Sequence, residues 1–554
     1  MSAPSPIGIA FRSPRLTAAL LTLAFGALYL AVRPPLFDLD GYSSWLDALG
    51  PGAYFNTNPH HLLENSIDVL IVKASGALAI DARVALQVLG ITLNCLTIYA
   101  LCLLLADVTS SQFFAVIATT LVATSPQFWY FGLQNKPYPL MYLAFVLYLW
   151  GWNTHDRSIP GATRLALAGG FLALAVCMQQ AAIFLVGAGT LAIVLAGERP
   201  LTRRVFVAII WVTGVGGVVL LVYVLMWVRI GRDEMSFFRW TMWYLQSVHP
   251  LQFQFPTSLI RAVLGLSGAI VQSDRLQDFV ETNWTPRAIL GTYAGLGIAG
   301  ILGFVLIAGR RGYRARITHL IRSDCLLAVS LLSIVFWAAF VIAWEPATAY
   351  YWAFILLPGV VCWGIIFRDD SRDLGKIALV VAAIVAWNVT FNLRYDRALS
   401  KNYPPPLLAA IRHNLGPKDI FVVLGREEWY ASMDYELLFD CLDRQPGHFG
   451  VPVIQDYVLP AHGSDWTTNL RRKFDDTLDA GGRVFIAGHL LNDDSYEDIN
   501  GSVSPFSPYI DPKTASINGD KLHDQIQGVL DDYTLVPSDF RIGADSYFLL
   551  EKSR

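Results

Sequence analysis

Five side chains capable of acid–base chemistry lie close together near the start of the chain. Residues 37–64, FDLDGYSSWLDALGPGAYFNTNPHHLLE, follow the first long apolar run and contain Asp38, Asp40, His60, His61 and Glu64. A carboxylate can take a proton from a hydroxyl group, and an imidazole can transfer a proton or bind an anion. The stretch therefore indicates either a catalytic site or a polar surface beside a membrane.

The composition indicates a protein that crosses a membrane many times. Of 554 residues, 54% are hydrophobic and only 15% are charged, and the mean hydropathy is +0.45. The chain is too apolar for one soluble domain and too long for a single anchor. We predict about eleven transmembrane helices, each from an apolar run long enough to cross a ~30 Å hydrocarbon core. The turn at Gln179-Gln180 is so short that the two runs beside it can instead form a re-entrant hairpin. The runs are residues 16–32, 82–105, 110–125, 137–153, 162–178, 180–197, 205–228, 288–309, 324–344, 348–367 and 375–391.

Basic residues predict the orientation in the membrane. With a cytoplasmic N-terminus, the inner segments hold most of the arginines, above all those of RRGYRARITHLIR at 310–322. The predicted location is the inner (plasma) membrane, with the opening stretch outside the cytoplasm. The outer side then receives the first outer loop 33–81, the turn 125–137, the outer loop 229–286, the turn at Glu345-Pro346 and the chain beyond about residue 395.

The C-terminal part changes character. Residues 401–554 contain 24 Asp and Glu against 14 Lys and Arg, and a single cysteine, Cys441, so no disulfide can form within this part. Short apolar runs at 421–425, 483–488 and 546–551 predict strands, and residues 406–415, 466–479 and 519–531 predict helices. We therefore expect a transmembrane domain over 1–395 and a soluble extracytoplasmic α/β domain over 396–554. No basic patch suggests nucleic acid as a partner.

The first outer loop predicts two amphipathic helices. Tyr42, Trp45 and Leu49 share one face of a short helix that lies on the membrane surface. Asn58 is a typical N-cap and Pro59 a typical first residue of a second helix. On that helix His60 and Glu64 lie four residues apart, and a neighbouring face holds His61, Asn65 and Asp68.

Asp40-Gly41-Tyr42, directly after the first transmembrane run, resembles a family motif. The sequence resembles the GT-C superfamily of polyprenyl-phosphate-sugar-dependent glycosyltransferases, such as protein O-mannosyltransferases and aminoarabinose lipid A transferases. The similar features are an acid, a small residue and an aromatic at this place, followed by an interfacial helix, many spans and a C-terminal outer domain. The resemblance implies that an acid of the first outer loop is the general base or positions the acceptor. By motif position this role falls to Asp40, with Asp38 as the alternate; the alternative role of Asp40 is an N-cap.

Several further residues are candidates for substrate binding. His60, His61 and Glu64 suit phosphate or acceptor hydrogen bonds, a divalent ion, or a solvated polar face. Lys136 can neutralise a lipid phosphate, or its side chain can extend to the membrane interface without a role in binding. Arg229 and Arg232 can bind phosphate, or they can anchor the end of a helix in the interface. Glu345 lies between two apolar runs, where a carboxylate indicates a polar cavity, although Glu-Pro is also a turn signal. Since the turn at Gln134-Asn135-Lys136 lacks the second acidic motif of metal-dependent members, we expect no cofactor and do not favour a metal.

Together these features predict an integral membrane glycosyltransferase that moves a hexosyl or pentosyl group from a polyprenyl-phosphate donor to an extracytoplasmic lipid, glycan or protein. The alternative is a transporter or flippase for a lipid-linked saccharide. Such proteins usually carry ionisable residues in mid-membrane, whereas the spans here are nearly free of Asp, Glu, Lys and Arg.

Overall fold

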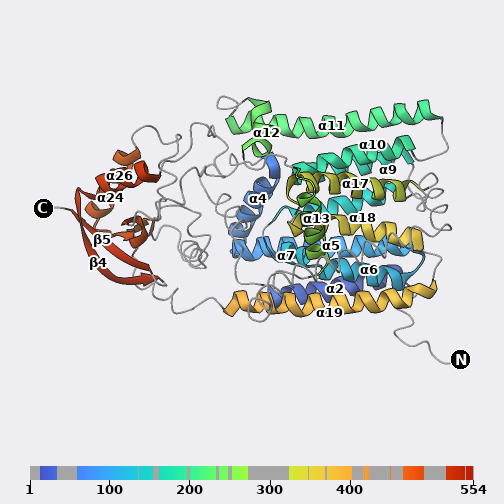
Figure 1. The fold of residues 1–554 in the computed structure, drawn as a ribbon, viewed down its shortest axis with the longest axis horizontal. Coiled ribbons are helices and arrows are strands. Elements are labelled where there is room, and N and C mark those ends of the chain that lie inside the picture. Colours follow the sequence, from blue (N-terminus) through green and yellow to red (C-terminus); the bar gives the residue numbers. More distant parts are fainter. Residues whose placement is uncertain are drawn as a thin grey trace. The chain divides into compact units, whose positions relative to one another are not determined.

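The described residues of the computed structural model form two compact units, one within residues 13–398 and one within 399–552. The first is a bundle of helices and the second contains a β-sheet (Figure 1). The structure describes residues 13–33, 59–134, 136–153, 161–195, 200–231, 236–247, 253–271, 324–346, 348–367, 371–401, 416, 418–422, 449–450, 466–491, 519–542 and 545–552.

The bundle is built from the apolar runs of the sequence. Each predicted run lies in a helix, except 288–309, which is outside the described residues. The bundle helices are α2 (Pro14–Val32), α5 (Ala82–Thr109), α6 (Gln112–Thr124), α7 (Pro126–Leu133), α8 (Tyr138–Trp152), α9 (Gly161–Met178), α10 (Phe184–Leu195), α11 (Leu201–Gly231), α17 (Cys325–Trp344), α18 (Ala349–Phe367) and α19 (Ser371–Lys401).

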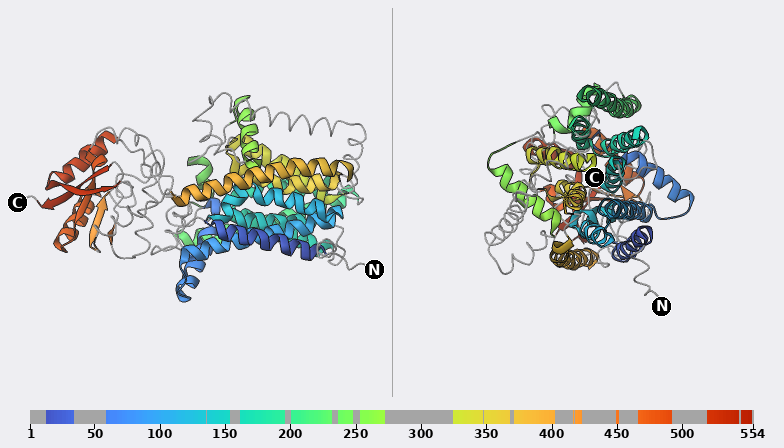
Figure 2. Two further views of the ribbon diagram at one scale, coloured as in Figure 1. Left: turned by 90° about the horizontal axis from the view of Figure 1, so that it is seen from below. Right: turned by 90° about the vertical axis from the view of Figure 1, so that its right-hand side faces the viewer.

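Six helices of the described chain are long and apolar enough to cross a membrane, and others are apolar but shorter. The chain is thus a multi-pass membrane protein, and Figure 2 shows its helices side by side, both along and end-on to the bundle. The number of spans stays a prediction, because several described helices are short and one predicted run is not described.

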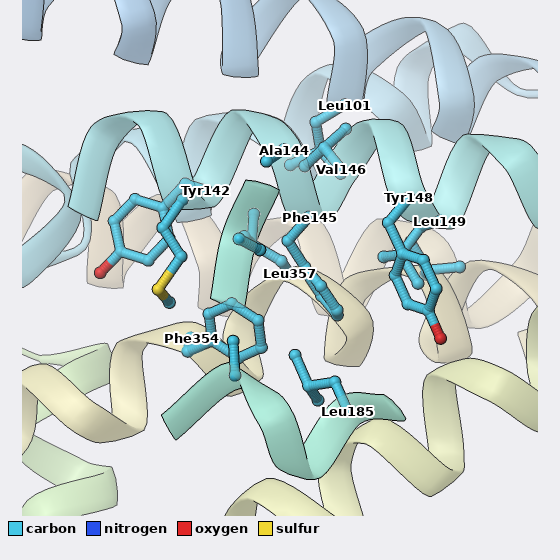
Figure 3. Close-up of a cluster of buried hydrophobic side chains, with 14 of the residues drawn as sticks. Leu101, Tyr142, Ala144, Phe145, Val146, Tyr148, Leu149, Leu185, Phe354 and Leu357 are labelled. Carbon is cyan, nitrogen blue, oxygen red and sulfur yellow. The ribbon is translucent and has the colours of Figure 1, made fainter. Parts of the chain in front are cut away.

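The centre of the bundle is aromatic. Phe145 of α8 lies 4.2 Å from Phe354 of α18, and Phe354 lies 4.3 Å from Trp337 of α17, measured between ring centroids. Figure 3 shows Phe145 and Phe354 beside Leu185 of α10 and Leu357. This packing joins helices that are far apart in the sequence into one core.

A helix break at Ser125 corrects the predicted turn 125–137. Residues Pro126–Leu133 are helical rather than a turn, and only a short connection containing Lys136 remains before α8. Proline has no N–H to continue α6, so the last carbonyls of α6 need other donors. Tyr29 of α2 donates its hydroxyl to the Ala123 carbonyl at 2.7 Å, and Asn392 of α19 donates to the Thr124 carbonyl at 3.2 Å.

The predicted outer loop 229–286 contains two helices, α12 (Phe237–Ser247) and α13 (Thr257–Ile270). Helix α13 was not predicted. It packs against α18, where a side chain in place of Gly265 would collide with the Pro346 carbonyl and Trp352. Its C-terminal Ile270 carbonyl accepts a hydrogen bond of 2.8 Å from Asn388 of α19.

The second unit contains a five-stranded sheet in the order β2-β1-β3-β5-β4. Strands β1 (Asp419–Val422), β2 (Phe449–Gly450) and β3 (Val484–Ala487) are parallel, whereas β5 (Asp545–Lys552) is antiparallel to β3 and to β4 (Tyr533–Ile542). Helices α24 (Trp466–Asp479) and α26 (Gly519–Leu530) bury Leu470, Phe474 and Ile526 beside Ile486 of β3.

The predicted helices 466–479 and 519–531 are α24 and α26, but strand β4 was not predicted. Its sequence contains Pro537, Ser538 and Asp539, which are typical of a turn, and the register with β5 shifts between Pro537 and Arg541. Strand β1 overlaps the predicted strand 421–425 at its last two residues, and residues 423–425 and the predicted helix 406–415 lie outside the described residues. The α/β domain as a whole stays a prediction.

Candidate functional site

The two histidines lie in a turn that is fastened to the C-terminal end of α9. Residues Pro59–His61 form one turn of 3-10 helix, η1. Nδ1 of His61 lies 3.1 Å from the Met178 carbonyl oxygen, and the Leu63 amide donates to the Cys177 carbonyl at 3.2 Å. Tyr223 of α11 donates its hydroxyl to the Pro59 carbonyl at 2.8 Å. Three contacts with two bundle helices therefore position the histidines.

This turn corrects the predicted second amphipathic helix. A continuous helix from Pro59 was expected, but α4 (Glu64–Ala77) begins at Glu64. The physical reason is the Leu63 amide, whose hydrogen bond goes to α9 and not to a preceding residue of its own helix. His60 and Glu64 are consequently on different elements and do not share one helical face.

Aromatic rings surround the histidines. The His60 ring lies nearly parallel to the ring of Trp344, the last residue of α17, with a centroid distance of 6.4 Å. His61 meets His60 edge-on at 4.5 Å and Tyr138 of α8 at 6.1 Å. The turn, the C-terminal ends of α9 and α17 and the N-terminal end of α8 thus meet at one end of the bundle, here called the histidine end.

A cavity of about 440 Å³ has His60 in its lining and is otherwise lined almost entirely by apolar side chains. Its volume is in the range of ligand pockets, roughly 300–1,000 Å³. Ile183 and Leu220 line it while being 42% and 54% exposed, so the cavity opens on the apolar surface of the bundle. The remaining lining residues are Val176, Gln180, Ala181, Phe184, Gly216, Val219, Tyr223, Phe237, Thr241, Met242, Phe340 and Trp344.

Helix α12 closes part of this cavity. Its residues Phe237, Thr241 and Met242 belong to the lining, and Gln180, in the 3-10 turn η2 (Gln180–Ile183), donates to the Thr241 carbonyl at 2.8 Å. One sequence feature could have indicated this cavity, namely the three glycines of VTGVGGVV in α11. Glycine is unfavourable in a helix interior unless space is needed beside the backbone, and Gly216 lines the cavity with no atom within 4 Å of a Cβ placed there.

Comparison with solved structures identifies the fold. No protein-family model and no curated protein sequence matches the chain. The structure matches ArnT from Cupriavidus metallidurans bound to undecaprenyl phosphate, with a TM-score of 0.53 and 13% sequence identity over 96% of this chain and 97% of that chain. The chain has the GT-C fold. The resemblance predicted from Asp40-Gly41-Tyr42 and the span pattern is confirmed at the level of fold.

Two further structures with this fold match less closely. The Archaeoglobus fulgidus oligosaccharyltransferase in complex with Zn and sulfate gives a TM-score of 0.45 and 14% identity over 88% of this chain and 69% of that chain. The S. cerevisiae protein O-mannosyltransferase Pmt1-Pmt2 complex bound to the sugar donor gives 0.31 and 12% over 41% and 36%.

Other predicted site residues of this GT-C chain also lie at the histidine end. Glu345 directly follows Trp344 and accepts a hydrogen bond of 3.0 Å from the Thr348 hydroxyl. Glu64 is the first residue of α4, and Lys136 precedes Tyr138, which faces His61. Arg229 is exposed in the last turn of α11, beyond Trp227, whose ring contacts Phe237 at 5.7 Å.

Asp38, Asp40 and Arg232 lie outside the described residues of the GT-C chain. Their roles, and those of the helix predicted over 42–49, stay predictions. Among the described residues, no group of three or more His, Cys, Asp or Glu side chains is arranged to hold a metal ion.

Helix α4 carries a buried carboxylate that was not predicted to be a site residue. Asp68 is 3% exposed, and Asn65 and Ser75 on the same helix are also buried. Leu70 is 60% exposed, so α4 buries polar groups and turns part of its apolar side outward. Helices at a bilayer interface have this arrangement when their apolar side faces lipid. The signal in the sequence was the spacing of Asn65, Asp68 and Ser75.

Proposed function

We propose that this protein is a membrane glycosyltransferase that transfers a sugar from a polyprenyl-phosphate donor to an acceptor outside the cytoplasm. The observation that carries the proposal is the apolar cavity that opens on the apolar surface of the bundle and has His60 in its lining. A polyprenyl chain needs an apolar groove that it can enter from the bilayer, and the phosphate needs a polar group at one end of that groove. The GT-C fold, which this chain shares with ArnT bound to undecaprenyl phosphate, supports the same donor class.

The chemistry of such a transfer requires few groups. In the proposed reaction the Asp40 carboxylate takes the proton of the acceptor hydroxyl, and the hydroxyl oxygen attacks the anomeric carbon of the sugar. The bond between that carbon and the phosphate oxygen breaks, and polyprenyl phosphate leaves with the electron pair. Asp38 positions the acceptor or tunes the base, and cationic or hydrogen-bonding groups stabilise the departing phosphate. We propose His60, His61, Lys136 and Arg232 as candidates for this contact, without a metal ion.

Two glycines of α11 allow a matched test of the cavity. A Cβ at Gly216 or at Gly214 meets no atom within 4 Å, so a side chain can begin at either position without a collision. Gly216 lines the cavity, whereas Gly214 is exposed and does not. Both substitutions replace glycine by a better helix former, so their effects on helix stability are similar.

The measurement is the binding of radiolabelled undecaprenyl phosphate to the purified protein in detergent, followed by transfer from a polyprenyl-phosphate sugar. Gly216→Leu fills the groove and should weaken binding about tenfold or more, which corresponds to ~1.4 kcal/mol. Gly214→Leu should bind as the unmodified protein does. Equal binding by both variants would show that the cavity is not the donor site. Movement of a lipid-linked saccharide across the bilayer without modification of an acceptor would instead support a flippase.

A further inference from the structure

The serines of α17 differ from other hydroxyl side chains of the bundle. Hydroxyls on membrane helices commonly donate to a carbonyl one turn earlier in the same helix. Thr97 of α5, Thr190 of α10 and Ser267 of α13 do so, at 2.8, 2.6 and 2.8 Å. Ser330 and Ser333 are completely buried on α17, yet neither hydroxyl has a hydrogen-bond partner among the described residues. Because a buried polar group without a partner is costly, we expect these serines to bind something else.

Two polar side chains of α8 belong to the same region. Helices α8 and α17 pack against each other and run in opposite directions, because the first residues of α8 and the last residues of α17 both lie at the histidine end. The Tyr148 hydroxyl is fully buried, points away from its own helix (Figure 3) and interacts with Ser333. Away from the histidine end, Trp152 lies one turn beyond Tyr148 on α8, as Ser330 lies one turn beyond Ser333 on α17. The four side chains therefore form two facing levels between the helices.

None of these four polar groups forms a direct hydrogen bond. The buried atoms that lack a partner among the described residues include Tyr148 Oη, Trp152 Nε1, Ser330 Oγ and Ser333 Oγ. The Tyr148 hydroxyl is close enough to Ser333 and Trp152 for an electrostatic interaction, but the distance or the angle to each is outside the range of a hydrogen bond. Polar groups that face each other in this way are commonly joined by a bridging water molecule.

The helices around this region favour a small neutral ligand. Gly189 brings the backbone of α10 close to Tyr148, since a Cβ at Gly189 would lie 2.9 Å from the Tyr148 hydroxyl oxygen and 2.4 Å from the Trp211 ring. Helices α8, α10 and α17 contain no Asp, Glu, Lys, Arg or His, so none of their side chains would balance the charge of a buried ion. The hydroxyls can donate and accept, whereas the indole can only donate. Water is the smallest neutral molecule that can satisfy both.

We propose that ordered water occupies a buried site between α8 and α17. The water bridges the hydroxyls of Tyr148 and Ser333. It also accepts a hydrogen bond from Trp152 and forms one with Ser330, so the site offers the two to four polar partners that a buried water needs. This inference is independent of the proposed function. The water joins two helices within the bundle whose far ends form part of the histidine end.

The direct test is a cryo-electron microscopy map of the full chain in a lipid nanodisc, at a resolution that shows ordered water. We expect density for water at roughly 2.5–3.0 Å from the hydroxyl oxygens of Tyr148 and Ser333. A direct hydrogen bond between these two hydroxyls would overturn the proposal. The absence of such density in a map that shows other buried waters would overturn it as well.

The stability of Tyr148→Phe and Ser333→Ala gives a second test, because the sign of the effect depends on the water. If water is bound, each substitution removes one of its hydrogen bonds and should raise the equilibrium constant of unfolding in a denaturing detergent roughly 2- to 10-fold. If the hydroxyls have no partner, their removal relieves a buried unsatisfied group, so stability is unchanged or increased. That second result would contradict the proposal.

The double variant tests whether the two hydroxyls share one ligand. Tyr148→Phe combined with Ser333→Ala should be less destabilised than the two single effects predict together, since either change already disrupts the bridge. Ser267→Ala is the matched control, because the Ser267 hydroxyl is bonded to its own helix, and its effect should add to that of Tyr148→Phe. Additive effects of Tyr148→Phe and Ser333→Ala would show that no common water joins them. If a variant does not fold, the map of the unmodified protein decides the question.

Discussion

The two histidines, adjacent in the sequence, differ in their surroundings. Nδ1 of His61 faces a backbone carbonyl, which can only accept, so this nitrogen carries a proton and the ring is fixed on α9. His60 instead lines the cavity and lies against Trp344. The sequence placed both histidines among the binding candidates but did not distinguish them, because the distinction depends on Met178 and Trp344, which are far away along the chain.

The role of Asp40 is testable by a substitution that separates catalysis from helix capping. Asp40→Asn keeps the size of the side chain but removes the group that accepts the proton, so turnover should fall roughly 10²–10⁴-fold while donor binding changes little. Asparagine is nearly as good an N-cap as aspartate, so a residue with only a capping role would tolerate the change. The measurement is the rate of sugar transfer by purified protein at saturating donor.

Asp38→Asn is the companion of that experiment, since two acids two residues apart can exchange roles. Near-normal transfer by both variants, with intact donor binding, would place the base elsewhere. Glu345→Gln is then the next variant to measure, because Glu345 lies at the histidine end next to Trp344.

At the scale of elements, the sequence predicted what depends on local composition. Long apolar runs such as those of α5, α11 and α17 are helices, because every backbone polar group within a bilayer must find a partner inside its own segment. Helix α7 was missed because Pro126, Gly132 and several polar residues are typical of a turn. Helix α13 was missed because Thr257–Ile270 is short and contains two glycines.

The cavity was beyond prediction for a different reason. Its walls come from five separate stretches of the chain, around residues 60, 180, 220, 240 and 340, and no local sequence pattern predicts which stretches meet. Only the glycines of α11 hinted that space is left beside that helix. Gly265 has a different role, because it allows close packing and does not leave space. The Pro346 carbonyl and the Trp352 ring lie so close to its backbone that no Cβ fits there.

The break between α6 and α7 gives a prediction about stability. Tyr29→Phe removes the donor of the buried 2.7 Å hydrogen bond to the Ala123 carbonyl, and Pro126 has no amide hydrogen that could compensate. We expect a loss of about 0.5–1.5 kcal/mol in the free energy of unfolding, typical of hydrogen bonds between membrane helices. The measurement is unfolding of the purified protein by a denaturing detergent.

Tyr99→Phe is the matched control for this loss. Tyr99 is half-buried on α5, and the described residues supply no hydrogen-bond partner for its hydroxyl. This variant should unfold as the unmodified protein does. Equal stability of the two variants would mean that the break does not depend on Tyr29.

At the scale of the whole molecule, two arginines of the predicted inner segments join neighbouring helices. Arg164, near the start of α9, donates to the Asn153 carbonyl at the end of α8, and Arg204, near the start of α11, donates to the Val194 carbonyl in the last turn of α10. The histidine end lies at the opposite end of α9. The orientation itself stays a prediction, with His60 and the first outer loop outside the cytoplasm.

The most direct test of glycosyl transfer is the lipid content of cells that lack this protein. If the protein consumes a polyprenyl-phosphate sugar, deletion of its gene should cause this lipid to accumulate, and mass spectrometry of lipid extracts would also identify the sugar. The unmodified gene should restore the normal level, whereas the Asp40→Asn variant, expressed to the same level in the membrane, should not. Lipid extracts without any accumulated polyprenyl-phosphate sugar, alongside an unchanged set of outer glycans and lipids, would contradict the proposed function.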